Sequence, residues 1–150
     1  MKRKHWLWIM VSVLAVIGFI FFNSSLSYTK SDSISILVSQ FLRPVLNPFQ
    51  VIPAGSYRRL IRKLAHFVEF AVLGGCLGFG AQKLKFPGRW VVAAVLAVVI
   101  ACADETIQSF SAERTNSIFD ICIDLAGAAC GMIAVHLMKK YKKQRGMHHG

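Results

Sequence analysis

Acidic residues are scarce in this sequence, which has 7 Asp and Glu against 18 Lys and Arg in 150 residues. Charged residues of both signs make up only 17% of the chain, whereas 55% of it is hydrophobic. This composition excludes intrinsic disorder, which depends on few apolar residues. It also argues against a soluble nucleic-acid-binding domain, because so small a domain would not carry that much apolar surface beside a net charge of +11. A small integral membrane protein remains.

Cysteine is also scarce, and the four cysteines lie inside apolar stretches rather than in polar loops. We therefore expect neither a disulfide framework nor a zinc site, which needs paired ligands at short spacing. Free cysteines are usually buried, so we expect all four to pack as small residues in helices: Cys76, Cys102, Cys122 and Cys130. Internal repeats are absent, and the length fits a single domain over residues 1–150.

Long apolar runs are abundant. Four of them are long enough to cross about 30 Å of hydrocarbon at about 1.5 Å per residue. A membrane span must satisfy its own backbone hydrogen bonds, so helices are expected. The first run is long for a signal peptide and no clear cleavage site follows it, which favours an uncleaved helix. The sequence predicts an all-α, polytopic membrane protein with helices over residues of about 6–22, 60–82, 90–110 and 117–138.

The only long connection, between the first two runs, has an amphipathic pattern. Apolar residues recur at helical spacing from Ile34 to Val45, with serine, glutamine and arginine between them. This pattern predicts an interfacial helix over about residues 32–43, lying at the membrane surface. After the fourth run, residues 139–150 form a basic tail.

The distribution of basic residues predicts the orientation of the chain. Eleven of the 18 Lys and Arg residues precede the first run, join the second to the third, or follow the fourth, and no acid accompanies them. Lys and Arg in excess mark the cytoplasmic side, so both termini are expected inside the cell. All seven acids then lie on the outer side, either in the outer half of the membrane or beyond it, together with the remaining seven basic residues.

Charged residues inside the expected helices are the main functional signal, because charge within a membrane is costly and usually faces a bundle interior or a wet cavity. The second helix carries a stripe at spacings of three or four residues: Arg59, Arg62, Lys63, His66 and Glu69. The polar residues of the third and fourth helices are Asp104, Glu105 and Gln108, and Asp120 and Asp124. In the expected topology all of these residues reach one depth in the outer leaflet, which predicts a shared site.

Glycine pairs at GxxxG spacing occur on two of the same helices. They are Gly74 with Gly78, and Gly127 with Gly131. Such pairs let another helix approach closely, and an oligomer built through either pair is one possibility.

Three motifs, taken as a set, resemble the VanZ-like family of membrane proteins. Residues 62–70 (RKLAHFVEF) resemble the family's RK-x-x-H-x-x-E-[YF] signature, and residues 104–108 (DETIQ) resemble its DE-x-x-Q. Residues 114–127 (RTNSIFDICIDLAG) resemble R-x-x-S-x-x-D-x-x-x-[DN]-x-x-G, and the polar patch Asn23-Ser24-Ser25 is similar to the one usual after the first helix. In two departures, Ala112-Glu113 stands where Pro-Gly is common and Phe70 where Tyr is common.

This resemblance implies a bacterial cell-membrane protein of a family tied to glycopeptide resistance, teicoplanin in particular, in Gram-positive bacteria. It implies no agreed biochemical activity. It also brings Arg114 and Ser117, which lie in the third motif, into the candidate site.

One hypothesis is that the site binds or modifies a membrane lipid, a lipid-linked cell-wall precursor or a lipoglycopeptide. The candidate substrate-binding residues are Arg59, Arg62, Lys63, Gln108, Arg114, Ser117 and Asp124. Arginine suits this role because it holds phosphate or carboxylate in bidentate geometry. The candidate catalytic residues are His66, Glu69, Asp104, Glu105 and Asp120. His66 and Glu69 could act as a base and its orienting group, and the other three as acid/base groups or oxygen ligands of a divalent cation.

Two alternatives stay open. In the first, the protein is a non-catalytic module that docks a partner or shields cell-wall precursor, and the polar cluster stabilises the bundle through ion pairs. In the second, it conducts ions or protons, which the sequence disfavours because the acids lie toward one end of the helices. The sequence assigns no cofactor, no defined metal site and no nucleic-acid partner.

Overall fold

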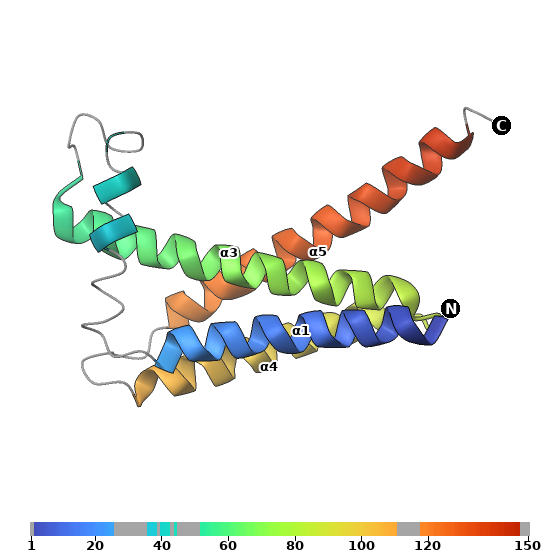
Figure 1. Ribbon diagram of the computed structural model, residues 1–150, viewed down its shortest axis with the longest axis horizontal. Coiled ribbons are helices and arrows are strands. Elements are labelled where there is room, and N and C mark those ends of the chain that lie inside the picture. The colour runs from blue at the N-terminus through green and yellow to red at the C-terminus, as the bar shows by residue number, and fades with distance from the viewer. Residues whose placement is uncertain are drawn as a thin grey trace.

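The computed structural model describes residues 2–25, 36–38, 40–42, 44, 52–110 and 118–147, and the regular structure in these ranges is helical throughout. The long helices are α1 (Lys2–Ser25), α3 (Ala54–Lys83), α4 (Arg89–Ser109) and α5 (Ile118–Met147) (Figure 1). Each of them is long and apolar enough to cross a membrane. The predicted all-α class and the four spans are confirmed. The interfacial helix expected over about 32–43 is not, because much of that stretch lies outside the described residues.

The helices extend beyond the apolar runs that predict them. α3 begins at Ala54 rather than at about residue 60, directly after Pro53, whose carbonyl oxygen accepts a hydrogen bond from the Tyr57 N–H (2.9 Å). Proline ends or begins helices because it lacks an N–H donor. α5 continues to Met147 through the basic residues expected as a tail, since lysine, arginine and glutamine are good helix formers and no proline interrupts them.

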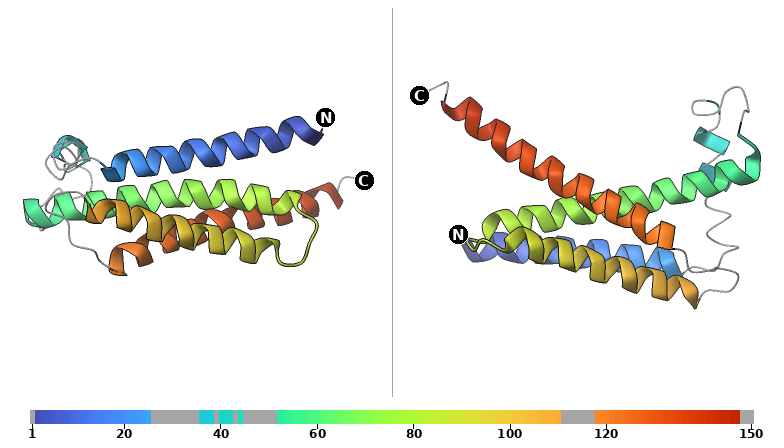
Figure 2. Two further views of the ribbon diagram at one scale, coloured as in Figure 1. Left: turned by 90° about the horizontal axis from the view of Figure 1, so that it is seen from below. Right: turned by 180° about the vertical axis from the view of Figure 1, so that it is seen from behind.

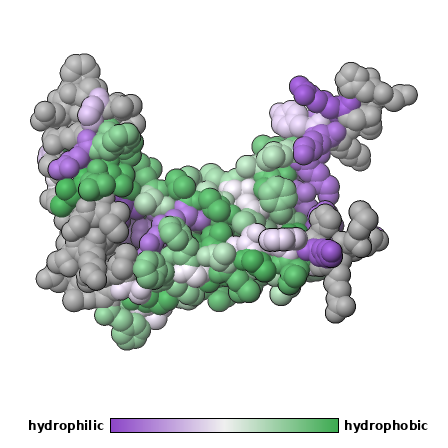
Figure 3. Space-filling view, viewed as in Figure 1, coloured by the Kyte–Doolittle hydropathy of each residue, from purple (hydrophilic) through white to green (hydrophobic). Residues whose placement is uncertain are grey.

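The helices form a bundle in which α5 crosses α3 obliquely and then projects away from the other helices (Figures 1 and 2). α1 lies against α3 and α4. The start of α1 and the end of α5 lie at the same end of the bundle, as an even number of crossings requires (Figure 1). Hydrophobic residues cover the middle of the surface, and hydrophilic ones gather toward the start of α3 and the end of α5 (Figure 3).

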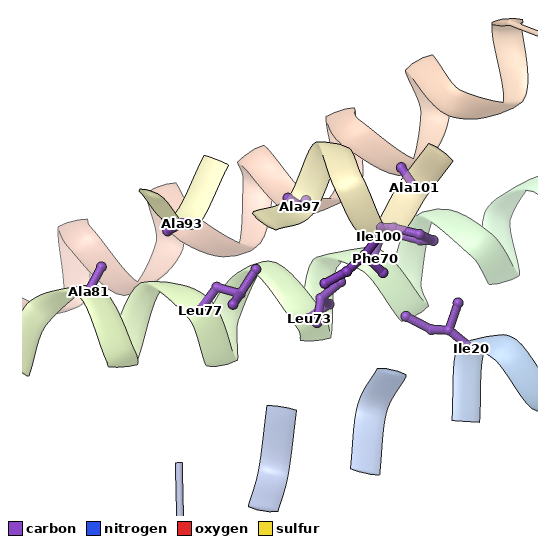
Figure 4. Packing of buried hydrophobic residues seen from close by; sticks show 10 residues of the cluster. Ile20, Phe70, Leu73, Leu77, Ala81, Ala93, Ala97, Ile100 and Ala101 are labelled. Carbon is purple, nitrogen blue, oxygen red and sulfur yellow. The ribbon is translucent and has the colours of Figure 1, made fainter. Parts of the chain in front are cut away.

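The apolar core lies between α1, α3 and α4 (Figure 4). On α3, buried Phe70, Leu73 and Leu77 follow one another at spacings of three or four residues and so form one face. The facing positions on α4 include Ala97 and Ala101, whose small side chains let the two helices approach.

The cysteines do not all follow the expectation of burial. Cys102, Cys122 and Cys130 are exposed on the outer surface of their helices, and Cys76 is half-buried. The outer surface of these helices is itself apolar, so a small, weakly polar thiol is tolerated there as it is in a core.

α3 and α5 form the most extensive helix–helix contact in the described part of the chain. Gly74 of α3 lies against the backbone of Ala128 of α5, and a Cβ built on Gly74 would overlap the Ala128 carbonyl oxygen. Gly127 of α5 lies in the same way against the carbonyl oxygen of Phe67 on α3, and Gly131 also meets the α3 backbone. The two helices therefore touch backbone to backbone, which only glycine permits at these positions.

The GxxxG glycines are thus used within one chain. Gly78 lies beside Met132 and Val135 of α5 at ordinary contact distance. An oligomer built through these glycines would require the α3–α5 contact to separate, and it stays a prediction.

We predict that Gly74→Ala and Gly75→Ala change stability in opposite directions. The first places a methyl group against a fixed carbonyl oxygen, and overpacking of this kind costs about 1–3 kcal/mol. The second meets nothing within contact distance and should gain up to about 1 kcal/mol of helix propensity. Unfolding of the two variants in detergent, followed by circular dichroism, measures both changes. Equal effects would contradict the backbone contact.

Candidate functional site

Polar side chains from four helices gather at one end of the bundle. They come from the last turn of α1, the middle of α3, the last turns of α4 and the first turns of α5. Of the residues proposed from the sequence, the structure brings together Lys63, His66, Glu69, Asp104, Glu105, Gln108, Asp120 and Asp124. We call this set, with Asn23 and Ser24 of α1, the polar cluster.

Three acids of the polar cluster are buried. The exposed fraction is 0% for Asp104, 2% for Asp124 and 6% for Glu105. Because the surrounding helices are apolar, these carboxyl groups need hydrogen bonds, cations or protons from the protein itself.

His66 and the two buried aspartates meet at the centre of the cluster. The Nδ1 atom of His66 lies 3.8 Å from Oδ2 of Asp104. A ring nitrogen of His66, a carboxylate oxygen of Asp104 and a carboxylate oxygen of Asp124 all lie within 4.8 Å of one another. Asp104 therefore lies where it can orient the imidazole, a role that the spacing along α3 suggests for Glu69.

Asp104 is held in place by Gln108, one turn further along α4. The Nε2 group of Gln108 donates a hydrogen bond to Oδ2 of Asp104 (2.7 Å), and it also lies 3.5 Å from the hydroxyl oxygen of Ser24. Gln108 thus connects the buried aspartate to α1. Its sequence spacing of four from Asp104 predicts the first contact but not the second.

Glu69 is held by α1. Asn23 donates a hydrogen bond from Nδ2 to Oε1 of Glu69 (2.8 Å). The other oxygen, Oε2, is buried and has no hydrogen-bond partner in the described part of the chain. The sequence does not identify Asn23 and Ser24 as candidate site residues. The signal for them is the polar triplet that ends the first apolar run.

Cations lie at the edge of the cluster. Lys63 forms an ion pair with Asp120 (2.7 Å), and their side chains are 42% and 36% exposed. Exposed ion pairs contribute at most about 1 kcal/mol, so this pair orders the edge more than it stabilises the fold. Arg62 is half-buried one residue earlier. Arg59 is exposed and its guanidinium contacts Ser56 on its own helix (3.3 Å), which leaves it outside the cluster.

Two proposed site residues, Arg114 and Ser117, lie outside the described residues. Their place in the site stays a prediction.

A cavity of about 270 Å³ lies at the opposite end of the bundle, between the start of α1, the end of α3 and the start of α4. Its lining is almost wholly apolar and includes Trp6, Met10 and Leu77. The polar cluster is therefore separate from this cavity.

We predict that Asn23→Leu destabilises the protein by about 1–3 kcal/mol, because it leaves the part-buried Glu69 carboxyl group without the amide donor. Adding Glu69→Gln should recover part of the loss, since the charge is then gone. Ser12→Ala, which removes a hydrogen bond within exposed α1, is the control and should stay within about 0.5 kcal/mol of the wild type. Unfolding free energies in detergent test this, and an Asn23→Leu variant as stable as the control would contradict it.

Comparison with known proteins adds the family. The model of the family described as VanZ/LLP1 matches residues 8–139, which include most of α1, all of α3 and α4, and most of α5. No curated protein and no solved structure matches the chain. The matched region covers all or most of each of the four membrane-spanning helices and includes every residue of the polar cluster. This multi-pass membrane protein therefore belongs to the VanZ/LLP1 family.

Proposed function

We propose that the polar cluster binds the head group of a cell-envelope amphiphile and acts on it by acid–base chemistry. The amphiphile is a membrane lipid, a lipid-linked cell-wall precursor or a lipoglycopeptide such as teicoplanin. The observation that carries this proposal is the meeting of His66, Asp104 and Asp124, from three helices, inside an apolar bundle. Charge buried at this cost within a membrane is usually functional.

The surroundings of the cluster suit a ligand with a polar head and an apolar tail. The Lys63–Asp120 ion pair is part-exposed, so the edge of the cluster is accessible. Exposed apolar side chains stand beside it on the same helices, among them Leu64, Ile118 and Phe119. A lipid tail would lie along these side chains in the hydrocarbon, while the head group would reach the cations and then the buried acids.

The chemistry available at the cluster is proton transfer. Histidine is the side chain whose protonation changes most readily near neutral pH, and a carboxylate beside it can orient the ring. In the proposal His66 is the general base, Asp104 orients it, and Lys63 and Arg62 hold a phosphate or carboxylate of the ligand.

The proposal places the cluster in the outer leaflet of a bacterial cell membrane, with both termini in the cytoplasm. The acid-free basic residues lie at the start of α1, between α3 and α4, and at the end of α5. The start of α1, the α3–α4 connection and the end of α5 all lie toward the end of the bundle opposite to the polar cluster (Figure 1). This separation supports the orientation.

A second candidate function is non-catalytic, with the cluster serving bundle stability and the protein docking a partner or shielding precursor. The contacts that favour it are those joining different helices, Asn23 to Glu69 and Lys63 to Asp120. Variants that separate abundance from activity distinguish the two functions.

We predict that Lys63→Gln and Arg62→Gln each weaken envelope-lipid binding about tenfold or more, since each removes a cation that holds the head group, while protein abundance stays within about twofold. His66→Ala and Asp104→Asn should instead lower function, since each removes part of the acid–base pair. Native mass spectrometry of the protein with extracted envelope lipids measures binding, and teicoplanin sensitivity of a Gram-positive host measures function. His136→Ala, at the other end of α5, is the matched control. Binding that falls only in proportion to abundance would favour the non-catalytic function, and unchanged binding would overturn the proposal.

We also predict that the α3–α4 connection is cytoplasmic and the start of α3 is outside. In a cysteine-free variant, Ser56→Cys should react with a membrane-impermeant maleimide in intact cells, and Lys85→Cys should react only after lysis, because positive charge is retained inside. The reverse pattern would place the polar cluster in the inner leaflet.

A further inference from the structure

The centre of the polar cluster has the geometry of a metal site. Three ligand atoms, one ring nitrogen of His66 and one carboxylate oxygen each of Asp104 and Asp124, all lie within 4.8 Å of one another. The three residues come from α3, α4 and α5, so three rigid helices hold them. Sites built on helices are positioned more firmly than sites on loops.

The distance between the His66 imidazole and the Asp104 carboxylate is close to that between two ligands of one ion. The 3.8 Å between His66 Nδ1 and Asp104 Oδ2 is too long for a hydrogen bond. Two ligands each about 2.0–2.2 Å from a tetrahedral ion lie about 3.4 Å apart. A shift of a few tenths of an ångström would therefore bring the imidazole and the carboxylate into coordination distance.

Asp124 supplies the observation that points to a ligand. Its side chain is only 2% exposed, and its Oδ1 atom has no hydrogen-bond partner among the described residues. A buried carboxylate oxygen without a donor costs free energy that the native state must offset. A cation coordinated by this side chain, together with His66 and Asp104, would offset it.

The balance of charge around Asp124 favours a cation as well. The buried carboxyl groups of Asp104 and Asp124 share the centre of the cluster, and Glu105 is also buried. The Lys63 ammonium pairs with Asp120 at the part-exposed edge of the cluster. His66 on α3 faces Asp124 from the helix packed against α5. Repulsion between buried like charges is strong at low dielectric, and a divalent ion would reverse it.

The ligand types select the class of ion. One imidazole with two carboxylates suits Zn²⁺ or Mn²⁺, whereas Ca²⁺ and Mg²⁺ prefer oxygen ligands alone. The hydrogen bond from Gln108 to Asp104 matches the outer partners that orient metal-binding carboxylates.

From these observations we infer that His66, Asp104 and Asp124 coordinate a divalent transition-metal cation, Zn²⁺ or Mn²⁺. The site needs only these three side chains and is independent of any lipid. If lipid binding also holds, the cation would present positive charge to the phosphate or carboxylate of the head group, and His66 and Asp104 would serve as metal ligands in place of the general base and its orienting group.

The test uses the full chain in detergent, with His148 and His149 replaced by alanine so that the terminal histidines cannot bind metal. After treatment with a chelator, the protein is titrated with ZnCl₂ and with MnCl₂ by isothermal calorimetry. We expect one ion per chain for at least one metal, and Asp124→Asn and Asp104→Asn should weaken binding about tenfold or more. His136→Gln, toward the other end of α5 beside Trp90, is the matched control and should stay within about threefold of the wild type.

Several outcomes would overturn the inference. The first is that neither ion shows saturable binding. The second is that Asp124→Asn binds the ion as tightly as the wild type does. The third is that His136→Gln loses as much affinity as Asp124→Asn does. If Asp124→Asn does not fold, the absorption spectrum of Co²⁺ bound to wild type and to His66→Gln reports whether the imidazole is a ligand. An unchanged spectrum then refutes the site.

The same samples separate this inference from the proposed function. Lipid binding that persists in EDTA, in a protein that takes up no ion, would refute the metal site and leave lipid binding standing. An ion that binds without any lipid would support the metal site alone.

Discussion

The backbone contact between α3 and α5 is the constraint on which the rest of the structure depends. Gly127 of α5 lies against the carbonyl group of Phe67, the residue after His66. Asp124 precedes Gly127 by one helical turn, so the contact that seats Gly127 also brings Asp124 to His66. A larger side chain at Gly127 would push α5 away and separate the members of the polar cluster.

The backbone contact between α3 and α5 contributes a larger share of the stability in a membrane than it would in water. Lipid tails are as apolar as leucine, so burial of apolar side chains gives little drive for helices to associate. Packing of small residues and polar contacts between helices take its place. The chain uses both: glycines and alanines where α3 meets α5 and α4, and the Asn23–Glu69 and Lys63–Asp120 contacts at one end of the bundle.

The sequence predicts much of the fold, but it predicts few of the contacts that site residues make with residues on other helices. Spacing along one helix predicts that Gln108 reaches Asp104, and the structure shows this hydrogen bond. Spacing cannot show that Asp104 lies beside His66, because that contact joins two helices. It also misses Asn23 and Ser24, whose only local mark is a polar triplet at the end of an apolar run. The helix ends are longer than the apolar runs because polar residues such as Lys139 and Arg145 continue a helix as readily as apolar ones do.

By itself, the sequence determined the four membrane-spanning helices and the segregation of acids from eleven of the basic residues. These properties follow from local composition, since a span satisfies its own backbone and its length is set by the hydrocarbon. Only the tertiary structure decided which helices touch, that the GxxxG glycines face a helix of the same chain, and that His66, Asp104 and Asp124 converge. The physical reason is that helix pairing depends on the fit of two surfaces, which periodicity along one helix does not contain.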